Sequence, residues 1–134
     1  MSKCVSALAL LLVLVSWPWL AVPNNASASS EEAWITAGRE IAKAHCTRCH
    51  VVGDINPLGG ISSTPSFQLM VNELDDWLER FETFFARRPH PAVIRFEDVD
   101  YSEADPPSTV PIVLKVEDVE ALVRFAESLK KKAE

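Results

Sequence analysis

Three side chains that can hold a metal or a cofactor lie within one short stretch. Residues 44–53 read AHCTRCHVVG, so two residues separate Cys46 from Cys49, and His50 follows directly. Thiolates and imidazoles ligate zinc, a C-x-x-C pair can act as a redox dithiol, and C-x-x-C-H is the pattern that attaches c-type haem. The rest of the sequence must distinguish these three chemistries.

The first 28 residues are typical of an export signal. Lys3 supplies a positive charge, Val5 to Val15 form an apolar run, and Ala26-Ser27-Ala28 is a small-x-small cleavage pattern. We expect cleavage of this signal peptide to leave residues 29–134 as one domain, periplasmic or otherwise exported.

The alternative is an uncleaved membrane anchor. The apolar stretch up to Val22 approaches the about 20 residues that a membrane span needs. Pro18 and the polar residues after Pro23 favour a cleaved signal peptide. We therefore expect membrane association only if the segment is not cleaved.

Cleavage would also change the cysteine count. Cys4 would be lost, which leaves Cys46 and Cys49 as the only pair in a compartment where thiols normally form disulfides. A zinc site needs four N or S ligands, and beyond the CTRCH motif only His45 and His90 are available. A thioredoxin-like dithiol needs a βαβ setting, which the sequence does not predict.

Covalent haem attachment therefore explains the motif best. The two haem vinyl groups form thioethers with Cys46 and Cys49, and His50 projects to the iron as its proximal ligand. The sequence predicts one covalent haem c, bound by these three residues.

Apolar periodicity predicts three helices, at about residues 31–44, 65–88 and 116–132. Thr64 is the expected cap of the second helix, with Pro65 in its first turn. One apolar stripe is expected along the second helix: Phe67, Val71, Leu74, Leu78, Phe81 and Phe85.

Long loops are expected between these helices. Residues 51–63 hold three of the four glycines, and five prolines exclude a long helix from residues 89–114. Strand signals are limited to fragments such as AVIRF and PIVLK. The predicted fold is all-α, with a thin core that a haem would complete.

With these elements in place, residues 31–132 resemble a class I cytochrome c. In that family a glycine-bearing helix precedes C-x-x-C-H, and a C-terminal helix carrying an aromatic residue crosses it. Gly38 and Phe125 match the glycine and the aromatic residue. The resemblance implies a small cytochrome c-like fold around the haem, in which Gly38 allows close helix approach.

The surroundings of the haem follow from the resemblance. A ligating histidine usually donates its other N–H to a carbonyl. A proline after the motif supplies that carbonyl in the family, and Pro57 and Pro65 are both candidates. Trp77, Arg80 and Tyr101 are candidates for binding the haem propionates.

The sixth iron ligand departs from the family pattern. The family commonly places methionine in the loop before the last helix, where this chain has Val93 in RPHPAVIRF or Val110 in STVPIVL. Valine cannot ligate iron. His90 is the first candidate, a vacant or water-filled site the second, and Met70 the third, because Met70 lies on an amphipathic helix. His45 adjoins the attachment site and is a poor candidate.

The predicted function is an exported single-haem electron carrier that works by outer-sphere transfer through the haem edge, and not an enzyme by itself. Two alternatives stay open: an open-coordination haem protein that binds a small gas or anion, or a haem subunit of a larger oxidoreductase.

Charge points to protein partners. Removal of Lys3 leaves twelve of the thirteen Lys and Arg against nineteen Asp and Glu, which changes the formal charge from −6 to −7. No basic stripe is present, so nucleic acid is not expected. Redox partner proteins are expected to dock at the acidic loop 97–105 or at the haem edge, although this loop can also be plain solvated surface.

Overall fold

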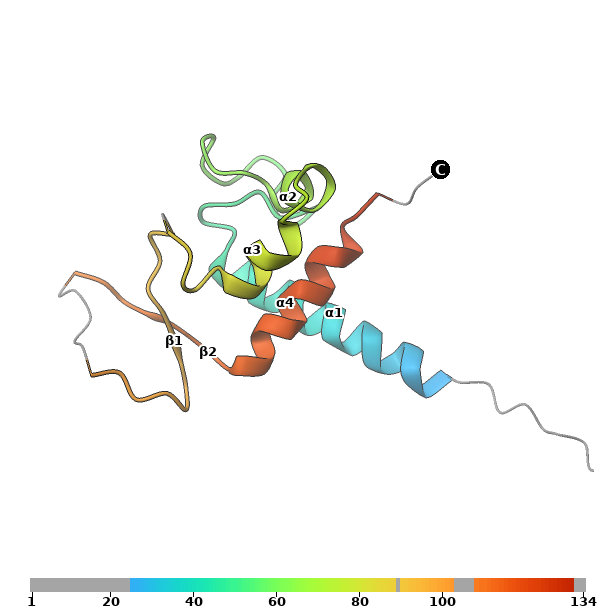
Figure 1. Cartoon of the computed structure of the whole chain (residues 1–134). Helices are drawn as coiled ribbons and strands as arrows, with labels where there is room; N and C mark the ends of the chain where they lie inside the picture. The colour runs from blue at the N-terminus through green and yellow to red at the C-terminus, as the bar shows by residue number, and fades with distance from the viewer. Residues whose placement is uncertain (1–24, 89, 103–107, 132–134) are drawn as a thin grey trace, which may run out of the picture.

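The computed structural model describes residues 25–88, 90–102 and 108–131. These residues form four helices, and a small two-stranded sheet extends to one side of them (Figure 1). This part of the chain is mostly helical, so the all-α prediction is correct for the helices and wrong about the sheet. The elements in order are α1 (Asn25–His45), α2 (Phe67–Glu73), α3 (Trp77–Thr83), β1 (Ile94–Phe96), β2 (Ile112–Leu114) and α4 (Val116–Ser128).

Helices α1 and α4 cross and form the main helix pair of the fold (Figure 1). Their contact depends on Gly38, because a Cβ there would overlap the backbone carbonyl of Ala121 and lie 2.8 Å from the Cβ of Phe125. Phe125 is buried on the facing side of α4. The prediction that Gly38 lets the two helices approach closely is confirmed.

The predicted second helix is interrupted. Helix α2 ends at Glu73, because the next residue, Leu74, has an extended backbone (φ −111°, ψ 125°), and α3 begins after Asp76. Two consecutive aspartates are poor residues for a helix interior. The Asp76 carboxylate instead accepts hydrogen bonds from Arg80 (2.7 Å) and Arg87 (3.2 Å) at the start of α3.

This break rotates the apolar face of the second segment. The predicted stripe is correct for Phe67 and Val71, which are buried, but Leu78 and Phe85 are 41% and 40% exposed. Phe81 is buried as predicted, and Trp77 and Phe84 pack against the core beside it. The predicted stripe was wrong for Leu78 and Phe85 because it assumed one continuous helix.

The start of α2 also differs from the prediction. Ser66 is the N-cap, and its hydroxyl oxygen accepts the Leu69 N–H at 3.1 Å, so the expected cap Thr64 lies before the helix. Pro65 is likewise outside the helix. Its carbonyl is therefore free of helical hydrogen bonding and can accept a bond from elsewhere.

The two strand fragments pair with each other. Strands β1 and β2 form a parallel two-stranded sheet in which Ile94 lies opposite Ile112 and Phe96 opposite Leu114. Leu114 is buried. The pairing lays the segment after α3 beside the segment that enters α4, so that both border the same interior space.

The helix boundaries require two corrections. Helix α1 begins at Asn25 within the described residues, earlier than the predicted residue 31. Helix α4 ends at Ser128, earlier than the predicted residue 132. The reason is that the Asn72 side chain accepts the Lys131 N–H at 2.8 Å, which fixes the chain in a non-helical course after α4.

The predicted signal peptide, residues 1–28, lies mostly outside the described residues and stays a prediction. Its proposed cleavage would remove the first four residues of α1, Asn25 to Ala28. None of the described helices combines the length and the hydropathy required for a bilayer span.

Candidate functional site

The CTRCH motif forms a tight turn directly after α1. The Cys46 N–H continues the helical pattern by donating to Ala42 O at 2.8 Å, and the N–H groups of Cys49 and His50 both donate to Cys46 O, at 3.1 and 2.9 Å. This turn gathers the two thiols and the imidazole at the end of one helix, as the sequence predicted.

Asn56 braces this turn from the loop that follows. Its side-chain nitrogen donates to the carbonyls of Thr47 (2.9 Å) and His50 (2.8 Å), and its Oδ1 accepts the Val52 N–H at 2.8 Å. One side chain thus satisfies three backbone groups of the turn. Sequence reasoning missed Asn56, because a single asparagine in a glycine-rich loop is an ordinary turn residue.

Gly60 lies against the same turn. Its φ of +76° favours glycine, and a Cβ there would lie 2.9 Å from the carbonyl carbon of His50. The next residue, Ile61, donates its N–H to Cys49 O at 2.9 Å. The loop therefore holds the backbone of the motif as well as covering it.

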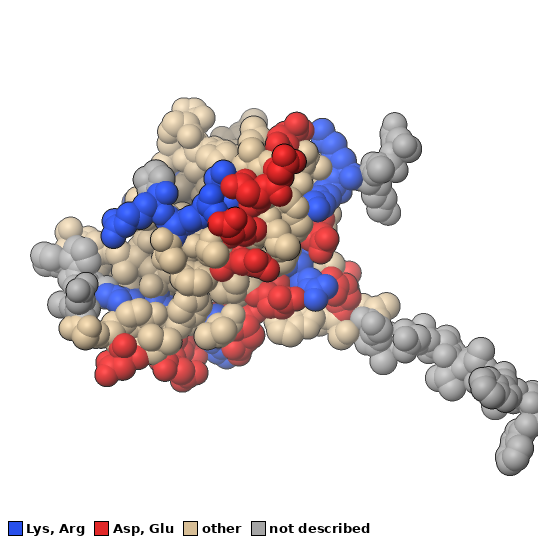
Figure 2. Space-filling view, in the orientation of Figure 1, with Lys and Arg blue, Asp and Glu red and all other residues tan. Residues whose placement is uncertain are grey.

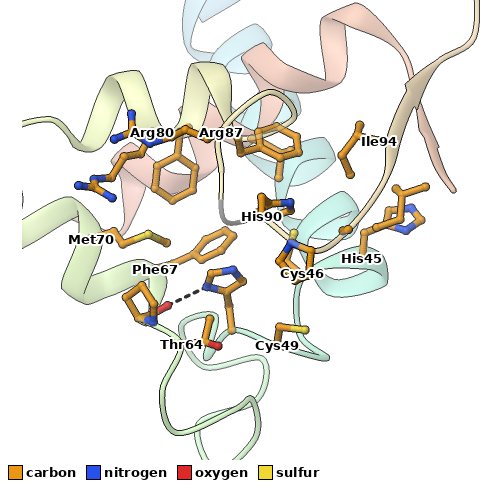
Figure 3. Close-up of a pocket in the computed structure, with 18 of the residues that line it drawn as sticks. His45, Cys46, Cys49, Thr64, Phe67, Met70, Arg80, Arg87, His90 and Ile94 are labelled. Carbon is orange, nitrogen blue, oxygen red and sulfur yellow. Dashed lines mark hydrogen bonds between the residues drawn. The ribbon is translucent and has the colours of Figure 1, made fainter. Parts of the chain in front are cut away.

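His50 is oriented by a carbonyl, and the structure selects Pro65 over Pro57. The distance from His50 Nδ1 to Pro65 O is 2.7 Å, marked by the dashed line in Figure 3. A carbonyl can only accept, so Nδ1 carries the proton and Nε2 keeps its lone pair. This is the arrangement of a metal-ligating histidine.

The environment of His50 also keeps its ring neutral. Burial lowers the pKa of His50 below its ordinary value; the Pro65 hydrogen bond opposes this, and the nearby His90 lowers it further. A neutral imidazole is the form that binds a metal.

The motif faces a mainly apolar cavity of about 440 Å³, which is within the size range of ligand and cofactor sites. Figure 3 shows its residues coming from the CTRCH turn, from α2 and α3, and from the segment that contains β1. The lining includes Ile41, Cys46, Cys49, His50, Phe67, Met70, Phe81, Phe84, His90, Ile94, Ile112, Leu114 and Leu122.

Cys46 lacks the lowered thiol pKa of a reactive dithiol. Cys46 and Cys49 are free thiols, and burial, aided by the nearby Cys49, raises the pKa of Cys46 to about 12. Reactive C-x-x-C pairs instead have a lowered thiol pKa.

The zinc interpretation also lacks support in the geometry. Within the ranges 25–88, 90–102 and 108–131, no three His, Cys, Asp or Glu side chains are grouped so that they could hold one metal ion. Cys46, Cys49, His45, His50 and His90 all lie within these ranges.

His90 borders the cavity together with His50. Its ring packs edge-on against Phe84, with 5.9 Å between ring centroids, and its Nδ1 is buried without a hydrogen-bond partner. Its backbone N–H donates to Arg87 O at 3.0 Å, which holds the segment close to α3. His45 also borders the cavity but is otherwise exposed.

The other positions considered for the sixth ligand are less suitable. Met70 lines the cavity but is only 8% exposed and is part of the hydrophobic core. Val110 is 90% exposed, and neither Val110 nor Val93 is part of the cavity wall.

A cationic wall completes the cavity. Of the three candidates for binding propionates, only Arg80 lines it. Trp77 lies under the Lys130 ammonium at 4.1 Å, and the Tyr101 hydroxyl accepts the Phe96 N–H at 2.9 Å, so both have other contacts.

Arg87 and Arg88 line the cavity beside Arg80 and were missed in the sequence. The signal that could have identified them is their position in the run RRPH, directly before His90. Asp76 and Glu79 bind Arg87 at 3.2 Å each, so this guanidinium is held in place at the cavity wall.

The acidic loop is only partly described. Glu97, Asp98 and Asp100 are exposed, whereas residues 103 and 105 lie outside the described residues. Figure 2 shows a broader band of Asp and Glu running diagonally across one face of the molecule, with Lys and Arg on either side of it.

Comparisons of the chain with models of protein families, with curated proteins and with solved structures gave no match. The function must therefore be argued from the chemistry of the site itself.

Proposed function

We propose that the protein is an exported c-type cytochrome that carries single electrons on one covalently attached haem. The observation that carries this proposal is the convergence of Cys46, Cys49 and His50 on one apolar cavity, with His50 Nδ1 hydrogen-bonded to Pro65 O at 2.7 Å. A site with two thiols and an oriented neutral imidazole in this order is the one that c-type haem requires.

The residues around the cavity fit a haem. Cys46 and Cys49 would hold it through thioethers, and His50 Nε2 would bind its iron. Phe67, Phe81 and Phe84 provide aromatic contacts to its macrocycle, since all three line the cavity. The buried, unpartnered Nδ1 of His90 on the same wall is a polar atom that otherwise costs stability.

The charges of the cavity wall agree with a haem as well. A haem combines an apolar ring with two carboxylates, and the wall combines apolar side chains with Arg80, Arg87 and Arg88. Guanidinium groups pair well with carboxylates. Asp76 orients two of these arginines from outside the cavity.

When bound, the haem supplies a one-electron Fe(III)/Fe(II) couple. The chain's part is to hold the iron's protein ligand still. The backbone bonds of the CTRCH turn, Asn56 and Pro65 fix His50, so that its position need not change between the two oxidation states. Such rigidity favours outer-sphere transfer over chemistry at the iron.

The test is haem retention after denaturation. The full chain, produced in a cell that matures c-type cytochromes, should keep its haem through acid–acetone extraction. Cys46→Ala and Cys49→Ala should each weaken retention, and the double variant should lose all haem. Cys4→Ala is the matched control and should behave as the wild type. Complete loss of haem from the wild type would overturn the proposal.

A further inference from the structure

His90 has no evident role in the haem-free chain. Its Nδ1 is buried with no hydrogen-bond partner. No Asp or Glu side chain within the described residues lines the cavity, so no carboxylate is available there to pair with the ring. A buried polar atom without a partner is uncommon and calls for an explanation such as an unplaced ion or ligand.

The position of His90 relative to His50 supplies that explanation. Both rings border one cavity. Each packs edge-on against a phenylalanine: His50 against Phe67 at 5.5 Å and His90 against Phe84 at 5.9 Å. The two imidazoles thus come from separate segments and meet in one apolar space.

The competing side chains have other roles. Met70 is buried in the core formed with Phe67 and Phe81, where a flexible thioether fills space. His45 is the last residue of α1 and is directly attached to Cys46, so it belongs to the side of the cavity where the motif lies. Val93 and Val110 have no donor atoms.

We propose that His90 would ligate the haem iron together with His50. This inference rests on the haem attachment proposed above. Two imidazole ligands produce a low-spin iron with no open position, and without methionine ligation the reduction potential is lower than in relatives that have it. The site is then closed to carbon monoxide and other gases, which favours electron transfer over gas binding.

The experiment compares spectra of the purified, haem-loaded full chain. Visible and electron paramagnetic resonance spectra of the ferric wild type should be low-spin, and the reduced protein should not bind carbon monoxide. His90→Ala should become high-spin and bind carbon monoxide when reduced, and added imidazole should restore the low-spin spectrum. Rescue by imidazole would show that the variant is folded and lacks only the ligand.

Two further variants serve as controls. His45→Ala removes the other histidine of the cavity wall, and Met70→Leu replaces the core thioether with a side chain of similar volume; both should keep the wild-type spectrum. His90→Met should produce the weak red absorption band of a methionine–iron bond. Should His90→Ala fold poorly, His90→Met still tests whether this position reaches the iron.

The inference and the proposed function fail differently. Absence of covalent haem would refute the proposed function, and the inference with it. Covalent haem with a high-spin wild type that binds carbon monoxide would overturn the inference alone. A low-spin spectrum that persists in His90→Ala, or a methionine band that disappears in Met70→Leu, would also overturn it.

Discussion

Replacing Asn56 with alanine should destabilise the protein through the CTRCH turn. The substitution removes two bonds donated to Thr47 O and His50 O and one accepted from Val52 N, at 2.8 to 2.9 Å. Each is worth about 1 kcal/mol net. We therefore expect Asn56→Ala to lower the free energy of unfolding by about 3 kcal/mol.

The assay is urea unfolding of the haem-loaded protein, followed by far-UV circular dichroism. Asn72→Ala is a matched control, because Asn72 in α2 also bonds backbone groups away from the CTRCH turn. It donates to Gln68 O (2.7 Å) and, at a long 3.5 Å, to Leu129 O, and it accepts from Lys131 N (2.8 Å). Asn72→Ala should cost about 2 kcal/mol and leave the haem spectrum unchanged. Asn56→Ala should alter the spectrum as well, because His50 loses support.

A loss below about 0.5 kcal/mol in Asn56→Ala, within the range of ordinary surface substitutions, would refute this reasoning. It would show that water replaces the amide without cost and that the turn is rigid by itself. A spectrum altered equally by both variants would show that haem geometry follows global stability, and not the local bracing of His50.

Three other predictions concern the helix pair, the charge near the haem and the acidic loop. Gly38→Ala should lower the free energy of unfolding by about 1–3 kcal/mol, because the added Cβ would overlap the Ala121 carbonyl. Urea unfolding would measure this loss of stability. An unchanged stability would show that α1 and α4 can separate freely. Arg87→Gln should lower the reduction potential of the haem, because it removes a positive charge that disfavours ferric iron. Redox titration would measure the change. Arg124→Gln is the control and should change the potential less, because Arg124 pairs with Glu31 and Glu120 away from the cavity wall. Electron transfer to a basic partner should slow as salt concentration rises, since the screening length is about 10 Å at 0.1 M. Neutralising Glu97, Asp98 and Asp100 should weaken that salt dependence. A rate that does not change with salt would identify the loop as solvated surface only.

The sequence predicted the parts of the fold that depend on local patterns. The contact between the glycine in α1 and the aromatic residue in α4 was implied by the family resemblance instead, and it is present because close packing at Gly38 leaves no room for a side chain. The break between α2 and α3 was missed because Leu74 and Leu78 continue a helical spacing across it. The local signal against a continuous helix was the pair Asp75–Asp76, and the break itself lies at the extended backbone of Leu74.

The part of the site formed by the CTRCH motif could be predicted from the sequence, because its residues are neighbours in the chain. Cys46, Cys49 and His50 are placed by one turn, so their spacing already defines their relation. The choice of Pro65 over Pro57 depended on how the glycine-rich loop returns to the motif, and periodicity carries no such information. Asn56, Arg87 and Arg88 were missed for the same reason, because periodicity does not show that Asn56 bonds the motif or that the two arginines line the cavity.

The most direct test of the haem assignment is the intact mass of the exported protein under denaturing conditions. The account predicts the mass of the mature chain plus one haem, and the bare chain mass when Cys46 and Cys49 are both replaced by alanine. A wild-type mass equal to the bare chain, or to that chain less the two hydrogens of a Cys46–Cys49 disulfide, would contradict covalent haem attachment at CTRCH.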